Sequence, residues 1–466
     1  MKTELEAASM LAAFEAQCEA YTFRVRGVSI WRLLRTPVGY ALQDLPLSSP
    51  PLGLFNVFIT TIRSLIAIVR LRPQTFRYVV KSYTSALSVK GELGWTDVYF
   101  DELLDHVPGG IRLTTKNTPV KKTMSSVLSS SLDCTAIHAL GAVMAYLSPI
   151  KEGDPMFNRL ATELDLHLGV RGFSAQRIRR LFSSFWWQSR MFEWLLSRLS
   201  PQTVIISDSG ERAMIAACRR CGVRLIELQH GVFTQNDPDC LPVAALIQAD
   251  ENALLLPDIL ALHGDYWVAR HRETAMGQSG RLRAVGVAVI DRYRAERERQ
   301  FHSDSNCLEL VLTTQGLARE ELICFLRDFL RGTIQPFRLS IKLHPVFDLS
   351  PDPYIAAFKA DPRVRVLLDE GEQNTYQLIA HADLHISIAS ASHFDAIGIG
   401  CPTVVLNLAG SNVVEDLAAT GCALYAETPS DLIAIVQGRD WTRLKENSPE
   451  MYFRRDFVTN MSQLIR

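Results

Sequence analysis

Short apolar runs separated by stretches of helical length dominate the second half of the chain, in two series. Runs of roughly four to eight β-branched and aliphatic residues that alternate with helical patterns are typical of buried parallel strands. The pattern therefore predicts an α/β protein with two doubly wound parallel sheets, facing one another across a cleft. The expected strands are 204–207, 224–228, 259–262 and 282–285 in the first series, and 308–313, 337–343, 364–368, 384–388 and 403–406 in the second.

The first 150 residues are irregular in pattern, with helices expected at 3–20 and 54–70, and a long amphipathic helix is expected at 175–197. The last of these carries an aromatic stripe at helical spacing, which is typical of a surface that packs on a core.

A polar stretch at 294–306 separates the two series and predicts a linker. The expected organisation is a first domain at 1–295, which is irregular and helical up to residue 200 and Rossmann-like from 201 to 295. A second domain would follow at 306–440, and a C-terminal helix at 441–466 could pack back on the first domain.

The composition restricts the class of protein. The chain has 466 residues, of which 47% are hydrophobic and 21% charged, as in a globular protein larger than one core. A net charge of −1 argues against a nucleic-acid partner, which would need a basic excess. Nine scattered cysteines fit a reducing compartment, and the acidic start at 1–6 differs from a signal peptide. A cytoplasmic protein is expected.

The segment 52–69 has the length of a membrane span, but Arg63 lies near its centre, where a charge is costly. Together with Arg70, Arg72 and Arg77, its apolar residues could form an interfacial helix on an anionic leaflet. An amphipathic helix docked on the protein itself is the alternative. Peripheral contact with the inner membrane is the expectation that follows.

His344-Pro345 ends one of the expected strands. Proline stops a central strand, so the chain turns after the histidine and holds the imidazole at the carboxyl edge of the sheet, where open α/β sheets bind ligands. There His344 could donate a hydrogen bond or a proton to a phosphate leaving group. The alternative is a histidine that only satisfies a backbone carbonyl.

A serine-containing turn follows the strand 384–388. Ser390 or Ser392 could cap the next helix, with Asp395 completing a variant of the capping box. The same geometry directs backbone N–H groups and a helix dipole at the cleft, which favours a phosphate, and Asp395 could then accept a hydrogen bond from a ribose hydroxyl. Both interpretations can hold together.

The first sheet carries its own candidates at strand ends. Gln229, His230 and Gly231 follow one strand and would face the cleft, and the glycine permits a positive φ or a close ligand approach. After the preceding strand, Asp208 or Glu211 could be the base that takes a proton from an acceptor hydroxyl. The alternative for both carboxylates is a structural role at the start of a helix.

Weaker candidates lie at other strand ends. Thr314 and Gln315 could border the sugar phosphate, and Glu370 could hold a nucleobase or an acceptor edge. No metal site is expected, because Cys218 and Cys221 form a single CxxC, and Pro238 stiffens the acidic pair around it.

Bacterial GT-B glycosyltransferases of surface and capsular polysaccharides resemble this chain at several of these segments. The shared segments are His344-Pro345, 387–392, 227–231, 262–267 with 285–286, and 27–35. The sequence is most similar to polysialyltransferase-like and Kdo-transferase-like enzymes, which use CMP-activated acidic sugars. The resemblance implies a metal-independent enzyme that transfers a sugar from a nucleotide-activated donor to a glycan or glycolipid. The nucleotide-sugar is a substrate, so no cofactor is expected.

The resemblance also implies roles for residues. His344 would contact the CMP phosphate, and Ser390 or Ser392 would help to hold it. Sialyltransferases of this kind carry an acidic-acidic-Gly motif with the base before the His-Pro. Here 208–210 matches it only in part and 369–371 lies after the His-Pro, so the identity of the base stays open.

Asp395 with Gly400-Cys401-Pro402 also resembles a segment of UDP-sugar enzymes and UDP-GlcNAc 2-epimerases, and CDP-glycerol phosphotransferases share the layout. An epimerase or a glycerol-phosphate transferase on the same fold is therefore an alternative. An inactive GT-B-like scaffold of a polysaccharide assembly complex is the alternative outside enzymes.

Overall fold

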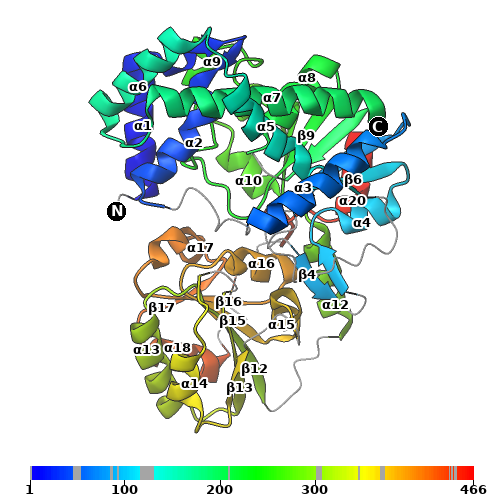
Figure 1. Ribbon diagram of the computed structural model, residues 1–466. Helices are drawn as coiled ribbons and strands as arrows, with labels where there is room; N and C mark the ends of the chain where they lie inside the picture. Colours follow the sequence, from blue (N-terminus) through cyan, green and yellow to red (C-terminus); the bar gives the residue numbers. More distant parts are fainter. Residues whose placement is uncertain are drawn as a thin grey trace.

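Two parallel sheets, one in each of two lobes, form the framework of the protein (Figure 1). The computed structural model describes residues 3–45, 54–83, 88–91, 94–115, 131–207, 210–300, 307–344, 347–367, 373–439, 441, 444 and 449–465. The first sheet has seven strands in the order β11-β10-β9-β8-β3-β6-β7, and the second has six in the order β14-β13-β12-β15-β16-β17. All pairings between these strands are parallel. The predicted fold class is confirmed as far as two α/β domains, each built on a parallel sheet.

All nine strands expected from the sequence are present close to their predicted bounds, and β3, β6, β7 and β17 are additional. The strands of the first sheet are β3 (Tyr78–Tyr83), β6 (Gly110–Thr115), β7 (Ser131–Asp133), β8 (Thr203–Ile206), β9 (Arg224–Leu228), β10 (Ile259–Leu262) and β11 (Leu282–Ala284). Those of the second are β12 (Leu308–Thr313), β13 (Phe337–Lys342), β14 (Val364–Leu367), β15 (Leu384–Ser387), β16 (Thr403–Leu406) and β17 (Leu424–Ala426). The antiparallel pairs outside the sheets are β1 (Arg24–Val25) with β2 (Val28–Ser29) and β4 (Ser88–Gly91) with β5 (Gly94–Asp97).

Helices cover both sheets. In the first lobe they are α1 (Glu4–Cys18), α2 (Ile30–Leu42), α3 (Leu54–Val69), α4 (Asp101–His106), α5 (Thr135–Leu147), α6 (Asp154–Leu168), α7 (Ala175–Leu199), α8 (Arg212–Cys221), α9 (Ala244–Gln248), α10 (Asp265–Arg270) and α11 (Ala275–Gln278). The remaining helices are α12 (Ala288–Gln300), α13 (Arg319–Gly332), α14 (Asp352–Phe358), α15 (Thr375–His381), α16 (Ser392–Ile399), α17 (Glu415–Ala419), α18 (Pro429–Gly438), α19 (Pro449–Tyr452) and α20 (Phe457–Ile465).

α7 is the long helix predicted at 175–197. The Ser174 hydroxyl caps it by accepting a hydrogen bond from a first-turn N–H. Phe182, Phe185 and Phe192 of its aromatic stripe are buried, as expected for a surface that packs on the core, whereas Trp194 is 40% exposed. α7 packs on α5 and α8 and covers one face of the first sheet (Figure 1).

α3 occupies the segment with membrane character. In the part of the chain that the structure describes, no helix combines the length and the apolar character that crossing a membrane requires. α3 instead lies on the surface of the first lobe against α5 and β7.

The connection between the domains is helical over the first part of the predicted linker at 294–306, because α12 continues through it. Arg294 and Arg297 on α12 donate hydrogen bonds to backbone carbonyls of the second domain, those of Gly398 and Ala382 among them, at 2.6 and 2.7 Å. α12 thus packs on α15 and α16 and belongs to the second lobe by its contacts.

The C-terminal segment crosses between the lobes. α19 packs on α16 and α10, and α20 then packs on α4 and α12. Phe457, Met461 and Ile465 of α20 are buried, and the Arg224 guanidinium at the start of β9 donates a hydrogen bond to the Leu464 carbonyl at 2.7 Å. The last helix therefore lies on the first domain.

Candidate functional site

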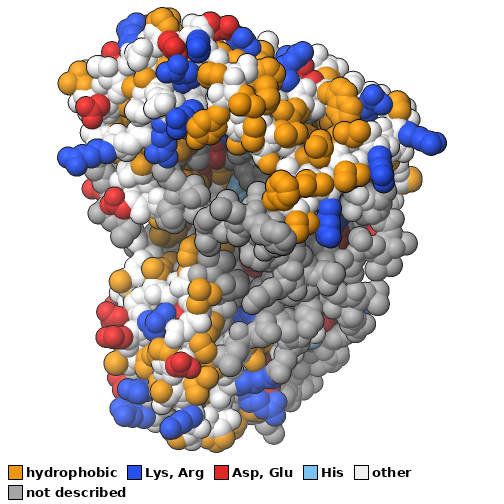
Figure 2. All heavy atoms as spheres, in the orientation of Figure 1, with side chains coloured by type: hydrophobic (Ala, Val, Ile, Leu, Met, Phe, Trp, Pro, Cys, Tyr) orange, Lys and Arg blue, Asp and Glu red, His pale blue; other side chains and the backbone are white. Residues whose placement is uncertain are grey.

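The candidate site lies between the lobes, where segments that follow strands of both sheets meet. Gly231, just after β9, donates its backbone N–H to the Tyr99 hydroxyl at 3.4 Å. Asp395, in the first turn of α16, interacts electrostatically with Tyr99 from the first lobe and with Tyr376 from the second. Figure 2 shows that the surface is hollowed between the lobes. The carboxyl ends of the strands thus face each other there.

His344 lies at the carboxyl edge of the second sheet, two residues after β13, and is half-buried. Its Nδ1 accepts a hydrogen bond from the Phe347 backbone N–H at 3.1 Å, and the two rings pack with centroids 4.6 Å apart. Burial lowers the pKa of His344, while Asp348 opposes the shift. A neutral imidazole whose Nδ1 accepts must carry its proton on Nε2, so His344 can offer an Nε2–H donor at neutral pH.

Asp348 fixes the loop around His344 and was not found from the sequence. Its carboxylate is buried and accepts hydrogen bonds from the Thr314 hydroxyl at 2.6 Å, the Tyr354 hydroxyl at 2.8 Å and the Arg319 guanidinium at 2.7 Å. These contacts join the loop after β12 to the loop after β13. The predicted donor-site residue Thr314 therefore uses its hydroxyl inside this network.

The serine turn before α16 forms a buried polar network. The Ser390 hydroxyl accepts from the Ser392 backbone N–H at 3.2 Å and from the Ser392 hydroxyl at 2.7 Å. The Thr313 hydroxyl lies 2.7 Å from the Ser392 hydroxyl and 2.9 Å from Nε2 of His385. Ser390 rather than Ser392 therefore contacts the first turn, and the expected capping box with Asp395 does not form.

Two buried histidines connect this turn to β16. Nδ1 of His385 and Nδ1 of His393 lie 2.7 and 2.6 Å from the Thr403 hydroxyl on β16. Both rings are fully buried, and burial lowers the pKa of His393 to about 3 and that of His385 as well. They are neutral groups that hold the start of α16 against β15 and β16.

Asp395 is the titratable group on the second-domain side of the interface. Burial raises its pKa to about 7, although the residue as a whole is only half-buried. Near neutral pH this carboxyl can therefore either donate or accept a hydrogen bond. The expected contact of Asp395 with a ribose hydroxyl stays a prediction.

The Gln229–Gly231 loop is only partly oriented as expected. His230 is exposed, whereas Gln229 is buried and faces inward. The Gln229 side chain accepts from the His263 backbone N–H and donates to the Gly231 carbonyl, both at 3.0 Å. Gly231 has a φ of +64°, the left-handed conformation for which a glycine is favoured. Gln229 thus fixes the turn that presents His230.

Glu211 does not point into open solvent. It lies at the start of α8, is buried, and forms an ion pair with Lys81, a fully buried residue of β3. A buried carboxylate that is paired with a buried ammonium is already held by its charge partner. The pairing favours a structural role for Glu211.

Three predicted site residues, Asp208, Pro345 and Glu370, lie outside the described residues. Gln315 lies beside Thr314 in the loop after β12 and is half-buried. The structure thus brings His344, Thr314 and Gln315 to one sheet edge, and Asp395 to the opposite side of the interface from His230.

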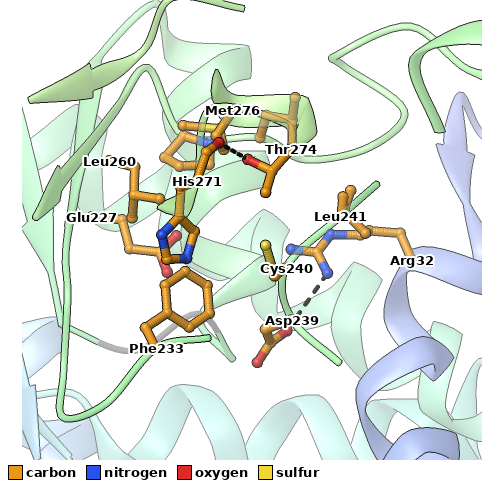
Figure 3. A pocket seen from close by; sticks show the side chains of 12 residues that line it. Arg32, Glu227, Phe233, Asp239, Cys240, Leu241, Leu260, His271, Thr274 and Met276 are labelled. Atoms are coloured by element: carbon orange, nitrogen blue, oxygen red, sulfur yellow. Dashed lines mark hydrogen bonds and ion pairs between the residues drawn. The ribbon is translucent and has the colours of Figure 1, made fainter. Parts of the chain in front are cut away.

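A small cavity with charged residues in its lining lies beside the loop of the first domain that follows His230 (Figure 3). Nη1 of Arg32 lies 3.5 Å from Oδ1 of Asp239, and Arg212 also pairs with this carboxylate. Glu227, at the end of β9, completes the cluster, and burial raises its pKa. Phe233 and His271 stack at the same cavity, with ring centroids 4.8 Å apart.

The segment 27–35, which carries part of the family resemblance, builds this support. Trp31 and Arg35 on α2 donate hydrogen bonds to the buried carboxylate of Glu15, at 2.9 and 2.6 Å. The Arg35 guanidinium also donates to the Cys240 carbonyl at 3.0 Å. α2 therefore fastens the loop that follows His230 to the helical part of the first domain.

One group in the described part of the chain has the spacing of metal ligands. Potential ligand atoms of Cys18, Glu163 and His167 lie within 4.8 Å of one another between α1 and α6. The imidazole of His167 lies 3.2 Å from the Glu163 carboxylate, which also accepts a hydrogen bond from the Cys18 thiol at 3.7 Å. The group is on the helical layer rather than at the sheet edges.

Comparison with known proteins gives similarity at the level of the fold. No protein family matches the sequence, and no curated protein matches it. The wall teichoic acid polymerase TagF aligns with 89% of this chain and 98% of its own, at 12% identity and a TM-score of 0.47. MurG of Acinetobacter baumannii aligns with 83% and 98%, at 11% identity and 0.47. UDP-GlcNAc 2-epimerase of Methanocaldococcus jannaschii aligns with 84% and 99%, at 10% identity and 0.48.

Proposed function

We propose that the protein is a metal-independent glycosyltransferase that moves a sugar from a nucleotide-activated donor, with a CMP-sugar favoured, to a surface polysaccharide or glycolipid. The observation that carries this proposal is the state of His344. Its Nδ1 accepts the Phe347 N–H, so a neutral ring offers Nε2–H at the carboxyl edge of the second sheet. A donor at this position is suited to a phosphate oxygen.

The donor phosphate would lie between His344 and the start of α16. Backbone N–H groups at the first turn of a helix and the helix dipole stabilise a phosphate, and the buried serine network holds this turn in place. Thr314 and Gln315 would border the same phosphate from the loop after β12. Asp395 would contact a hydroxyl of the donor.

The acceptor would enter from the first domain. Its hydroxyl oxygen forms the new bond to the anomeric carbon while the bond from that carbon to the donor phosphate oxygen breaks. The nucleotide leaves with the electron pair of the broken bond, and a base takes the hydroxyl proton. Because Glu211 is paired with Lys81, Asp208 or His230 is favoured as this base.

The partners that follow are a nucleotide-sugar and a glycan or glycolipid acceptor, with the enzyme in the cytoplasm and in peripheral contact with the inner membrane. The helical face that carries α3 supports this membrane contact.

A thermal-shift panel of nucleotides tests the proposal. A ligand that binds only the folded state raises the melting temperature as its concentration exceeds its dissociation constant. We expect CMP to stabilise the protein more than UMP, UDP or CDP-glycerol at equal concentration.

The panel also separates the alternatives. Greater stabilisation by UDP would favour a UDP-sugar enzyme or an epimerase, and greater stabilisation by CDP-glycerol would favour a phosphotransferase. If no nucleotide shifts the melting temperature at millimolar concentration, the proposal is wrong and a scaffold role is favoured.

A further inference from the structure

We propose that the face formed by α3, α5 and α7 seats the protein on an anionic phospholipid bilayer, with the groove between these helices taking up an acyl chain. This inference extends the membrane contact that is part of the proposed function. It rests on that function for the reason why the protein would bind a membrane, whereas the evidence for the face comes from the structure.

Large apolar side chains lie exposed on all three helices of this face. On α3, Phe58 and Val69 are 63% and 67% exposed, and on α5 Leu147 is 75% exposed. The other exposed apolar residues of the face are Ile62, Leu65, Ile66, Val143, Tyr146 and Trp194. α5 packs on both α3 and α7, and Figure 2 shows hydrophobic side chains gathered over this part of the first lobe. A contiguous patch of this kind marks an interaction surface.

A groove of about 350 Å³ opens within the face. Its lining residues are Leu65, Ile68 and Val69 of α3, Ala136, Ile137, Leu140 and Met144 of α5, and Trp187, Arg190, Met191 and Trp194 of α7. Arg190 is the only charged residue among them. A site this poor in polar groups selects its occupant by apolar contact, which a hydrocarbon chain provides.

The charge on this face is predominantly positive. α3 contains a single charged residue, Arg63, which is exposed, and α5 contains none. Exposed Arg70 and Arg72 follow α3 directly. On α7, the acidic Glu193 is already paired with arginines at positions 190 and 220.

Arginine side chains also stack on aromatic rings of this face. The Arg180 guanidinium lies 4.6 Å from the ring centre of Tyr146, and that of Arg198 lies 5.1 Å from Trp194. Aromatic rings with cationic partners beside an apolar surface are typical of the interface between lipid headgroups and acyl chains.

This charge distribution favours a bilayer over a second copy of the chain. A symmetric dimer through this face would bring the arginines of both copies into one interface, where like charges are unfavourable. An anionic leaflet instead attracts each of them, while the apolar residues between them enter the acyl region.

Co-sedimentation of the full chain with vesicles tests the inference. We expect binding to vesicles of phosphatidylcholine with phosphatidylglycerol, weaker binding to phosphatidylcholine alone, and weakening by added salt. Ile66→Glu should lower the vesicle partition coefficient by about tenfold or more, because it places a charge in the acyl region and adds repulsion from anionic lipid. Ile247→Glu is the matched control, since Ile247 is 85% exposed on α9, away from this face, and its binding should stay at the wild-type level.

Uptake of an acyl chain has its own readout. Phospholipids brominated on the acyl chain should quench the tryptophan fluorescence of the wild-type protein, and Trp194→Phe should lose part of this quenching. Binding that is equal in Ile66→Glu and Ile247→Glu, or no binding at all, would overturn the docking face. Vesicle binding without quenching would show that the groove does not take up an acyl chain.

The same variants distinguish this inference from the proposed function. The nucleotide-dependent thermal shift, measured without vesicles, should be unchanged by Ile66→Glu. Vesicle binding without any nucleotide-dependent thermal shift would refute the proposed function but not the docking face. A nucleotide-dependent shift without vesicle binding would refute the docking face but not the proposed function.

Discussion

A single backbone hydrogen bond determines which ring nitrogen of neutral His344 carries the proton. The Phe347 N–H occupies Nδ1, so the proton of the neutral ring belongs to Nε2, and burial keeps the ring neutral. The buried carboxylate of Asp348 holds the same loop through hydroxyls of Thr314 and Tyr354. Because removing a partner from such a buried group is costly, the loop is held in one conformation.

Asp395 should make the protein less stable as the pH rises. Burial raises its pKa to about 7 in the folded state, whereas an exposed aspartate titrates near pH ~4. The folded state therefore holds the proton more tightly, so its stabilising contribution is complete below about pH 4 and is lost as the pH rises through about 7. We expect Asp395→Asn to flatten this dependence in urea unfolding midpoints measured at about pH 5 and about pH 8.

Asp328→Asn is the control for this comparison. Asp328 lies exposed on α13, so its replacement should leave the slope with pH unchanged. If Asp395→Asn keeps the wild-type slope, the Asp395 carboxyl is ionised over the whole range and cannot donate a hydrogen bond to a sugar hydroxyl.

The candidate residues that could be found from the sequence share one property, which is that they follow a recognisable strand. His344, Asp395 and His230 all lie just beyond apolar runs. Tyr99 and Asp348 could not be found in this way. Tyr99 contacts a glycine 132 positions away, and Asp348 acts through side chains of another loop.

At the level of elements, β3 and β6 escaped prediction because their apolar pattern is interrupted by charge. β3 is an interior strand of the first sheet, between β8 and β6, yet it carries Lys81, and β6 carries Arg112. Both side chains are buried and paired, Lys81 with Glu211 and Arg112 with Asp101. A buried ion pair places in the core a residue type that pattern rules assign to the surface.

The Lys81–Glu211 pair ties β3 to the start of α8, and its loss should be costly. Glu211→Gln removes the carboxylate that balances a buried ammonium, and we expect the free energy of unfolding to fall by about 3 kcal/mol. The measurement is urea unfolding followed by tryptophan fluorescence. The double variant Lys81→Met with Glu211→Gln should recover much of the loss, because neither buried charge remains.

This experiment also separates a structural role of Glu211 from a catalytic one. If Glu211→Gln unfolds like the wild type but loses sugar transfer, Glu211 is the base and the structural role given to it here is wrong.

On the scale of the whole molecule, two domains could be predicted because each sheet has its own regular alternation of strands and helices. The sequence also predicts a C-terminal helix that could pack back on the first domain, but the contacts of α12 could not be predicted. Arg294 and Arg297 of α12 donate hydrogen bonds to backbone carbonyls of the second domain. These contacts join residues far apart in sequence through backbone acceptors, which leave no pattern in the chain.

Calorimetric titration of CMP decides whether His344 holds the donor phosphate. We expect the wild type and His381→Ala to bind CMP alike, since His381 lies at the end of α15 with an ion-pair partner, Glu296. His344→Ala should bind about tenfold more weakly or worse, because a hydrogen bond to a charged group contributes about 1.5–3 kcal/mol. If a folded His344→Ala variant binds CMP as tightly as the wild type, the phosphate is not held at His344 and the proposed site is wrong.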